Sequence, residues 1–422
     1  MRIAVFTDNF YPEIGGIQDS IRTTVRALGT RGHEIMVFAP AAAERDYRRA
    51  NLPVGEPEFG ANVTVRRLFS VPMPSSSQQS RIVIPIGQSW RELAEFQPDI
   101  VHTHSFLGVG LEGLWSARRF GVPVVGTNHW AMSAFDMYAP LARGAFRLVS
   151  SNAVVRYYQC CDYVTGPSNF TIEDMRTTGL SKPCKVISNP IDTNIFHKIS
   201  GAEKQRLKAR LGLGAATIIY AGRLAPEKRI DLLMHAVART RISLPEISLV
   251  LAGHGSSREK LKALAHELGI NQRVYFVGTL PHKELAELLS ASDLFAIAST
   301  SETQSMVLLQ AMACGLPVVG VRSGGLPEHI PAAAGLLAEP GSASDLSAKF
   351  VKILASQPSR EKMARQAHRF ASKFCVSSIT NAWEDIYEHI VRERSTEKMP
   401  SIPEPRYTQG MNHALEHHHT GL

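Results

Sequence analysis

The sequence predicts an α/β fold built from two doubly wound domains in tandem. Short apolar runs alternate with segments whose apolar residues recur at helical spacing, and this alternation starts again after Ser188-Asn189-Pro190. The length of 422 residues, at roughly 100–200 residues per domain, corresponds to two domains or three. With 44% hydrophobic and 20% charged residues, the composition excludes a disordered or fibrous chain.

The first half begins with a βαβ unit. A strand is predicted over residues 1–6, a helix over residues 21–28 and a second strand over residues 35–39. Further strands, separated by loops or helix-like stretches, are predicted over residues 63–68, 100–102 and 122–126. A parallel sheet with helices on both faces follows from this order. The polar run at 75–80 is expected to be a mobile loop.

The second half repeats the pattern. Its strands are predicted over residues 217–221, 247–252, 274–277, 294–298 and 317–321. Apolar residues at helical spacing predict a final amphipathic helix over residues 379–391. We therefore expect domains over residues 1–190 and 191–375, a C-terminal helix over 376–394 and a tail without a core over 395–422.

Charge and cysteine content narrow the class of protein. The net charge of +8 is not gathered in a basic arm, so a nucleic-acid partner is not expected. The five cysteines are odd in number and lack CxxC spacing, and the N-terminus does not resemble a signal peptide, which together predict a cytoplasmic protein. Because no run of 18 apolar residues occurs, any membrane contact is expected to be peripheral.

Two glycine-containing loops follow predicted strands and precede helices. The first contains Gly15 and Gly16, and the second contains Gly253 and Gly255. Glycine lets the backbone approach a ligand closely, and a helix N-terminus offers unpaired N–H groups to an anion. Taken alone, each motif is equally consistent with a plain turn.

Charged residues after two strands of the second half predict an anion and sugar site. Arg223 and Lys228 follow Gly222 in the sequence. They are the pair of cations that a diphosphate needs for neutralisation without a metal. Glu302 stands among hydroxyl residues at the start of a helix, where it could hold sugar hydroxyls or serve as a cap. A solvated basic loop is the alternative for the two cations.

Three histidines lie at or just after strand ends of the first half, namely His102, His104 and His129. At these positions the side chains are expected to point into the cleft between the domains. Zinc binding is disfavoured because His-x-His lacks a carboxylate at fixed spacing. A hydrogen-bonded structural role is the default for each histidine taken singly.

In combination, these motifs resemble the retaining GT-B glycosyltransferases of family four, also called group 1. The resemblance covers roughly residues 1–392, and the second half carries its more specific part. The residues that carry it are Gly15-Gly16, Asn128-His129, Gly222-Arg223 with Lys228, Gly253 and Gly255, and Glu302 followed by Met312-Ala313-Cys314-Gly315-Leu316-Pro317. The implied fold is two Rossmann-like domains facing a cleft.

The resemblance also implies site roles. Arg223 and Lys228 would clasp the donor diphosphate, Gly16 would approach it from the first domain, and Glu302 would meet the donor sugar. His129 would lie near the reacting centre. Backbone N–H groups around Ser305, Met306 and Val307 would contact sugar or phosphate. The implied donor is a nucleotide sugar, with UDP-sugar favoured over GDP-sugar, and neither a cofactor nor a metal is expected.

One position departs from the family pattern. The second glutamate of the E-x7-E motif, which takes the ribose hydroxyls in the family, is Gln310 here. An amide oxygen still accepts a hydrogen bond but lacks the charge-assisted one, a difference of about 1 kcal/mol or more. We therefore expect altered donor affinity or nucleotide preference.

The acceptor is predicted from a shorter motif. Glu302-Thr303-Gln304 resembles the Glu-Thr-Gln-Gly of bacterial enzymes that build glycolipids on diacylglycerol, with Ser305 in place of glycine. Such enzymes dock on anionic membranes, and the residues that could serve here are Arg81, Arg91, Arg118, Arg119, Ile82, Val83, Ile84 and Trp90. The alternative is that residues 81–96 are an ordinary connecting segment.

These inferences predict a cytoplasmic enzyme, peripheral at the inner face of the cell membrane, that transfers a hexose from a nucleotide sugar to a lipid such as diacylglycerol or a glycolipid. A capsule or lipopolysaccharide saccharide transferase is the alternative within the same class. A nucleotide-sugar 2-epimerase is a rival reaction type. A nucleotide-sugar-binding protein without activity is the rival from a different class, with Gln310 as its first indication.

Overall fold

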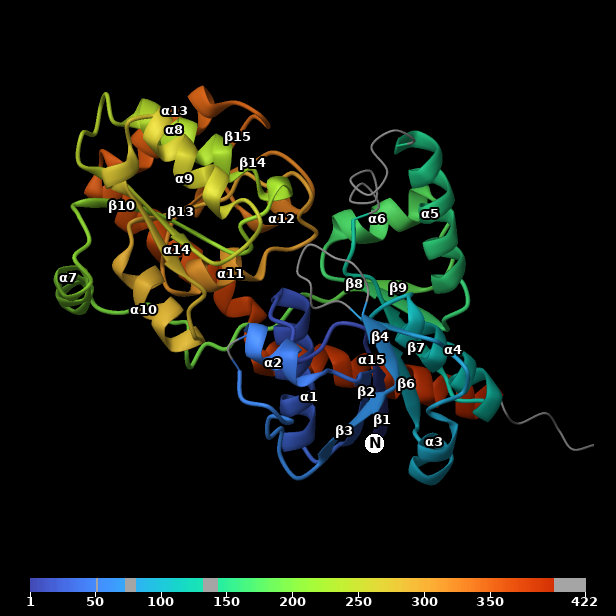
Figure 1. Cartoon of the computed structure of the whole chain (residues 1–422). Coiled ribbons are helices and arrows are strands. Elements are labelled where there is room, and N and C mark those ends of the chain that lie inside the picture. The colour runs from blue at the N-terminus through green and yellow to red at the C-terminus, as the bar shows by residue number, and fades with distance from the viewer. Residues whose placement is uncertain (51, 73–80, 132–142, 398–422) are drawn as a thin grey trace, which may run out of the picture.

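Two parallel sheets form the framework of the computed structural model, each in one half of the molecule (Figure 1). The structure describes residues 1–50, 52–72, 81–131 and 143–397. The first sheet has the strand order β3-β2-β1-β6-β7-β8-β9. Its strands are β1 (Arg2–Phe6), β2 (Glu34–Pro40), β3 (Val63–Leu68), β6 (Ile100–Thr103), β7 (Val124–Thr127), β8 (Tyr163–Gly166) and β9 (Cys184–Val186).

The second sheet has the order β12-β11-β10-β13-β14-β15. Its strands are β10 (Ala216–Ala221), β11 (Ile247–Ala252), β12 (Val274–Gly278), β13 (Leu294–Ala296), β14 (Val318–Val321) and β15 (Gly335–Ala338). In both sheets β1 and β10, the first strands of their halves, lie in the interior. Because the order reverses beside them, each sheet has a switch point at which a doubly wound fold binds ligands.

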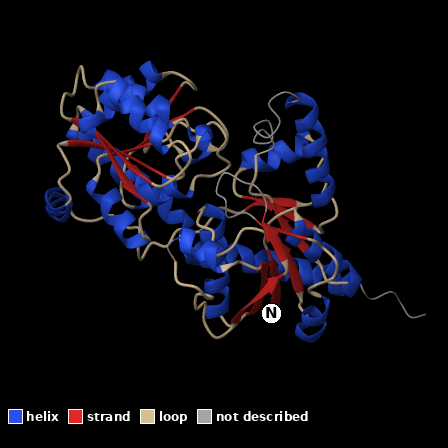
Figure 2. Cartoon of the chain, viewed as in Figure 1, coloured by secondary structure: helices blue, strands red, loops and turns tan. Residues whose placement is uncertain are grey.

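Helices cover the faces of both sheets, as Figure 2 shows. The first half contains α1 (Gly16–Thr30), α2 (Glu44–Ala50), α3 (Trp90–Phe96), α4 (Gly108–Phe120), α5 (Arg143–Tyr158) and α6 (Asn169–Thr177). The second half contains α7 (Gly201–Arg210), η2 (Pro226–Lys228), α8 (Ile230–Thr240), α9 (Arg258–Glu267), η3 (Asn271–Arg273), α10 (His282–Ala291), α11 (Met306–Ala313), α12 (Leu326–His329), α13 (Ala343–Leu354), α14 (Gln357–Ala371) and η4 (Ser372–Phe374).

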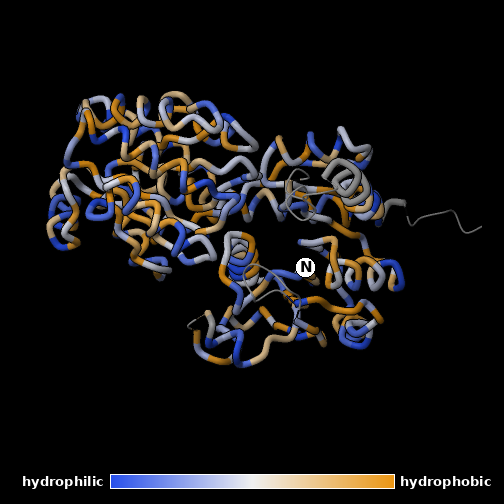
Figure 3. Tube along the Cα trace, turned by 45° about the horizontal axis from the view of Figure 1, so that its top comes forward, coloured by the Kyte–Doolittle hydropathy of each residue, from blue (hydrophilic) through white to orange (hydrophobic). Residues whose placement is uncertain are grey.

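The central strands are apolar because helices bury both of their faces. All six residues of β11 are buried, and so are all four of β6 and β14. A strand covered on both faces reads as a continuous apolar run rather than an alternating one. Figure 3 shows hydrophobic and hydrophilic residues alternating along the chain, as is typical of helices with one apolar side.

The α/β class with two doubly wound halves is confirmed, but three sheet strands and one hairpin were not predicted. These are β8, β9 and β15, with the hairpin of β4 (Ser70–Pro72) and β5 (Arg81–Val83). Each has only three or four residues, although β6, β7, β13 and β14, which were predicted, are equally short. The predicted loop at 75–80 and residues 398–422 of the predicted tail lie outside the described residues, whereas residues 395–397 belong to α15 (Val376–Glu397).

Helix α15 follows the second half in sequence but packs on α1 of the first half. In Figure 1 it lies, in orange-red, among the blue elements of the first sheet. Its apolar stripe is buried in one cluster with Ile3, Val5 and Ile21; the stripe consists of Ile379, Trp383, Ile386, Tyr387 and Ile390. The last helix thereby completes the core of the first half.

This packing makes a testable prediction about Trp383, which is 4% exposed. Trp383→Ala should lower the free energy of unfolding of the first half by roughly 3–5 kcal/mol, because a buried indole is replaced by a cavity. Glu388→Ala on the same helix removes an exposed side chain and should cost little. Urea denaturation followed by circular dichroism measures both. Equal midpoints for the two variants would contradict the packing role.

Candidate active site

The loops at the carboxyl ends of the two sheets meet at one interface. His129 follows β7 of the first sheet, and Thr303 follows β13 of the second. The Thr303 hydroxyl donates to the His129 carbonyl oxygen at 3.0 Å. Gly16 of the first half lies close to the Met306 side chain of the second half. A Cβ atom added at Gly16 would be 3.6 Å from the Met306 Sδ. The expected residues from both halves are therefore close together.

The glycines of the second sheet serve close backbone packing. An added Cβ at Gly253, whose φ is 141°, would lie 2.0 Å from the carbonyl oxygen of Gly222. The N–H of Gly222 donates to Ala252 and that of Gly253 donates to Gly278. These two N–H groups are already used within the fold, so they do not serve a phosphate. Gly255 similarly lets its loop approach the carbonyl of Leu224.

The predicted cations lie at the end of β10, each beside a glutamate. Lys228 Nζ is 2.5 Å from Glu302 Oε1, so the expected diphosphate and sugar residues form a direct ion pair. Arg223 Nη2 is 2.9 Å from Glu227 Oε1, and the Arg223 side chain is half-exposed. An anion entering here meets one guanidinium and one ammonium group, each held by a carboxylate.

The charge state of Glu302 follows from this pairing. Burial by itself would raise the pKa of the Glu302 carboxyl, but the charge and hydrogen bond of Lys228, together with Ser299 and Arg223, outweigh it and the pKa is lowered. Glu302 is therefore ionised at neutral pH. An ionised carboxylate accepts hydrogen bonds only, which suits it to sugar hydroxyl groups.

Helix α11 contributes backbone donors beside this pair. Ser305 caps the helix, and its hydroxyl oxygen accepts from the N–H of Leu308. The N–H groups of Met306 and Val307, at the first turn, have no partner within the helix. Gln310 is 5% exposed on the same helix. Met306, Val307 and Gln310 therefore lie on one helix of eight residues, which Ser305 caps and which starts four residues after Glu302.

The three histidine rings form one cluster. The rings of His102 and His104 lie 3.9 Å apart between centroids, and those of His104 and His129 lie 5.4 Å apart. Nδ1 of His104 is 3.1 Å from Nε2 of His129. His102 bonds Tyr387 of α15 at 2.7 Å and Thr127 at 2.6 Å. Of the three, His129 lies nearest to the second half.

Burial keeps this cluster uncharged. It lowers the pKa of His102 to about 3 and that of His129 to about 4, and it places the pKa of His104 well below its usual value. All three rings are neutral at pH 7. Each ring can therefore donate through one nitrogen and accept through the other.

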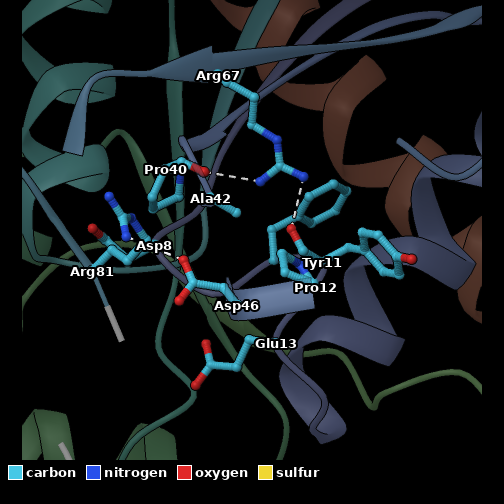
Figure 4. A pocket seen from close by; sticks show the side chains of 10 residues that line it. Asp8, Tyr11, Pro12, Glu13, Pro40, Ala42, Asp46, Arg67 and Arg81 are labelled. Atoms are coloured by element: carbon cyan, nitrogen blue, oxygen red, sulfur yellow. Dashed lines mark hydrogen bonds and ion pairs between the residues drawn. The ribbon is translucent and has the colours of Figure 1, made fainter. Parts of the chain in front are cut away.

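A small polar pocket lies in the first half, at the ends of β1 and β2. Figure 4 shows Asp46 facing Arg81, while Arg67 donates to the carbonyl oxygens of Pro40 and Tyr11. Its volume of about 20 Å³ has room for roughly one water molecule. By itself this pocket is too small for a sugar.

The same region corrects the predicted membrane contact. Arg81 is not a surface charge, because its Nη1 is 3.1 Å from Asp46 and its Nε donates to Ser70 at 2.8 Å. Val83 is 1% exposed. The expectation that these two residues meet a membrane is wrong. Residues 81–96 are not merely connecting, since they contain β5 and α3.

Contacts between the halves escaped the sequence prediction. Gln304 accepts from both the N–H and the side chain of Asn189 at 2.8 Å. Glu328 accepts from the N–H groups of Asn169 and Phe170 at the start of α6. His282 is 3.1 Å from Asp19. These pairs join residues more than 100 positions apart, which no local pattern reveals.

Comparison with known proteins assigns the family. The model of the glycosyl transferases group 1 matches residues 202–370, and that of glycosyltransferase family 4 matches residues 14–195. A phosphatidylinositol monomannoside mannosyltransferase of Mycolicibacterium smegmatis, GDP-mannose-dependent, is 30% identical over 77% of this chain and 81% of its own. The chain belongs to the family 4 glycosyltransferases. It is therefore an enzyme of the transferase class.

Other similar proteins agree with this assignment. The alpha-monoglucosyldiacylglycerol synthase of Streptococcus pneumoniae is 28% identical to this glycosyltransferase over 76% of the present chain and 70% of its own. Anabaena HepE, solved in complex with UDP, superposes with a TM-score of 0.72 at 21% identity, covering 92% of this chain and all of its own. The GT-B fold is thereby confirmed. No helix in the described part of the glycosyltransferase is long and apolar enough to span a bilayer.

The neutral histidines predict a pH-dependent stability. The unfolded chain binds protons at His102 and His129 below about pH 6.5, whereas the folded protein does not until about pH 3 to 4. Stability should therefore fall as the pH drops from 7 to 5, by about 2 kcal/mol for each buried histidine.

Urea denaturation at pH 7.5 and pH 5 tests this prediction. His102→Asn removes one titrating group, so the loss between the two pH values should shrink by about 2 kcal/mol relative to the wild type. His389→Asn changes an exposed histidine of α15 and should leave the loss unchanged. An identical pH dependence in the wild type and His102→Asn would contradict the assignment.

Proposed function

We propose that this glycosyltransferase moves a hexose from a nucleotide sugar to a lipid acceptor, with the anomeric configuration retained. The observation that carries the proposal is the Lys228–Glu302 contact of 2.5 Å, located where the strand-end loops of the two sheets meet. It joins a phosphate-binding cation to a sugar-binding carboxylate. Arg223 stands on the same strand end, and His129 lies across the interface.

Each residue has a role in the proposed donor site. The diphosphate gains negative charge as the bond to the sugar breaks, and Arg223 and Lys228 stabilise that charge without a metal. Entry of the diphosphate draws Lys228 from Glu302, whose carboxylate then accepts from sugar hydroxyls. The first N–H groups of α11, from Met306 and Val307, add donors at a positive helix end. Gln310 meets the ribose with its neutral amide.

The nucleotide base stays a prediction. We favour a UDP-sugar, and HepE, which shares the fold, is bound to UDP. The mycobacterial relative is named GDP-mannose-dependent, so the test includes both bases. Retention is proposed from the family resemblance, and the proton coupling constant of the product's anomeric centre measures it.

The lipid acceptor is supported by the relatives and by an apolar surface. Relatives are named for products on diacylglycerol and phosphatidylinositol. In the β4–β5 hairpin Val71 pairs with Ile82, and their side chains point away from the buried Ser70 and Val83. The exposed apolar residues of this hairpin and its flanks are Phe69, Val71, Ile82, Ile84 and Ile86. We name this set the hairpin patch.

The hairpin patch suits a bilayer surface. Phe69 is 66% exposed and Ile86 is 71% exposed, so both offer apolar area to the headgroup region. The α4 helix, which contacts β5, carries the exposed residues Trp115, Arg118 and Arg119. Indole and guanidinium groups favour the interface of an anionic membrane. We propose peripheral binding at the inner face of the cell membrane.

A screen of donors and acceptors tests the function. The purified chain is incubated with radiolabelled UDP-, GDP- and ADP-sugars, each with total lipid extract or with soluble oligosaccharides. Label in the lipid phase is expected. Label only in saccharide supports the capsule or lipopolysaccharide alternative. Nucleotide binding without transfer or donor hydrolysis supports the inactive binding protein.

The diphosphate clasp makes a quantitative prediction. Arg223→Ala or Lys228→Ala should lower kcat/KM by about 2–4 kcal/mol in transition-state stabilisation, because the leaving diphosphate loses a cation. Arg273→Ala, which breaks an exposed Arg–Glu pair in the same half, is the matched control and should stay near wild type. Wild-type rates in both Arg223→Ala and Lys228→Ala would show that these residues do not bind the diphosphate.

The hairpin patch predicts vesicle binding. Sedimentation with vesicles should rise with anionic lipid and fall with salt, since each nearby arginine adds about 1 kcal/mol. Replacing Ile84 and Ile86 together with Ser should weaken binding at least about tenfold, as each isoleucine contributes on the order of 1.5 kcal/mol. Donor hydrolysis should persist. Ile242→Ser, at a residue 87% exposed in the second half, is the control.

Two results would contradict the proposed membrane binding and lipid acceptor. If the paired Ile84 and Ile86 variant sediments like the wild type, the hairpin patch does not contact the bilayer. If the wild type ignores anionic vesicles altogether and glycosylates only soluble saccharides, the lipid acceptor is wrong.

A further inference from the structure

His129 is held by a histidine of the neighbouring strand. Strands β6 and β7 are parallel neighbours, with Thr103 paired to Gly126, so residues just beyond their ends lie side by side. The rings of His104 and His129 are nearly parallel, at 18°, and Nδ1 of His104 is 3.1 Å from Nε2 of His129. This contact occupies one of the two ring nitrogens of His129.

The hydrogen bond also couples the tautomers of the two rings. Both rings are neutral, so one nitrogen of the contact must carry the proton and the other must accept it. Once Nε2 of His129 is committed, the state of its Nδ1 is set as well. Among the described residues Nδ1 has no hydrogen-bond partner, and His129 is partly exposed. That atom is therefore available to a substrate hydroxyl.

His104 cannot swing away from this contact. His104 is 5% exposed, and the ring of His102 lies against it, with the ring centroids 3.9 Å apart and the planes tilted by 37°. His102 is itself fixed by Tyr387 on one ring nitrogen and by Thr127 on the other. The backbone N–H of His104 donates to the carbonyl of Phe6. The hydrogen bond between His104 and His129 is therefore held in place by the packing around His104.

The second half of the molecule holds the same residue by its main chain. The Thr303 hydroxyl donates to the His129 carbonyl at 3.0 Å, and Thr303 is 9% exposed. Its neighbours are fixed in turn, because Glu302 pairs with Lys228 and Gln304 with Asn189. The Thr303 hydroxyl therefore ties His129 to the loop that contains Glu302, Thr303 and Gln304, which we name the donor loop.

We propose that His104 and Thr303 are positioning residues that hold His129 from opposite sides, its ring from the first half and its main chain from the second. The inference rests on the proposed function, in which His129 meets the donor or the acceptor near the reacting centre. Both halves therefore contact this histidine, the first through its ring and the second through its main chain.

Paired substitutions separate a lost hydrogen bond from a changed shape. The amide of Asn places a donor and an acceptor near the position of Nδ1, so His104→Asn retains the bond and His104→Leu removes it. Thr303→Ser retains the hydroxyl, and Thr303→Val removes it at nearly constant volume. Circular dichroism and thermal melts confirm that each variant folds.

Kinetics then give the expected pattern. His104→Leu and Thr303→Val should each lower kcat about tenfold to a hundredfold, with little change in KM for the donor, because a misplaced group costs turnover more than binding. His104→Asn and Thr303→Ser should recover most of the rate. In a His129→Ala background all four changes should have little effect, since the residue through which they act is gone.

Other results would overturn the inference. Equal losses in the Asn and Leu variants, or in the Ser and Val variants, would show that the hydrogen bond has no role. Losses of full size in the His129→Ala background would show that these residues act elsewhere.

A readout without turnover keeps this inference separate from the proposed function. Nitrogen NMR of histidine-labelled protein, assigned with His129→Gln, should show one protonated and one unprotonated ring nitrogen for His129. In His104→Leu the two signals should move toward the averaged position of exchanging tautomers. Averaged signals in the wild type would refute the role of His104. A locked tautomer in a protein that transfers no sugar would support the positioning and refute the function.

Discussion

Three successive side chains, those of Glu302, Thr303 and Gln304, hold the site together. Glu302 pairs with Lys228, Thr303 bonds the His129 carbonyl, and Gln304 bonds the linker at Asn189. The donor loop is therefore tied at once to the cation that would bind phosphate, to the histidine of the other half and to the connection between the halves. Because hydrogen bonds need their partners within about 3 Å, a shift of this loop breaks several contacts together. The positions of the site residues and the relative position of the two halves therefore depend on the same contacts.

The final helix supports the same arrangement from behind. Helix α15 contributes Trp383 and Tyr387 to the core of the first half, although it comes after the second half in sequence. Tyr387 also forms a hydrogen bond with His102, whose ring lies against that of His104. A contact that fills the core of the first half thus also supports the histidine at the interface. A substitution that loosens the packing of α15 is therefore expected to shift the histidines, although it changes no residue of the site itself.

The two sides of the site use opposite electrostatics. On the first half, burial keeps His104 and His129 neutral, so they act through hydrogen bonds. On the second half, the Lys228 charge keeps the Glu302 carboxyl ionised in spite of burial. In the proposed function, an incoming diphosphate would take Lys228 from this ion pair. The two neutral histidines would add no charge to that exchange.

Most of the architecture was determined by the sequence alone, since buried parallel strands must be apolar throughout and glycine, lysine or arginine after them are local features. The tandem halves, the residues Arg223, Lys228, Glu302 and His129, and ten of the sheet strands could all be named in this way, the strands being β1, β2, β3, β6, β7, β10, β11, β12, β13 and β14. Only the tertiary structure decided their partners. It showed that Arg81 is an internal ion pair, that the Gly253 N–H is already used, and that His104 and Thr303 converge on His129. The physical reason is that periodicity reports how a segment is buried, whereas a contact between residues 129 and 303 depends on how two separately folded sheets dock.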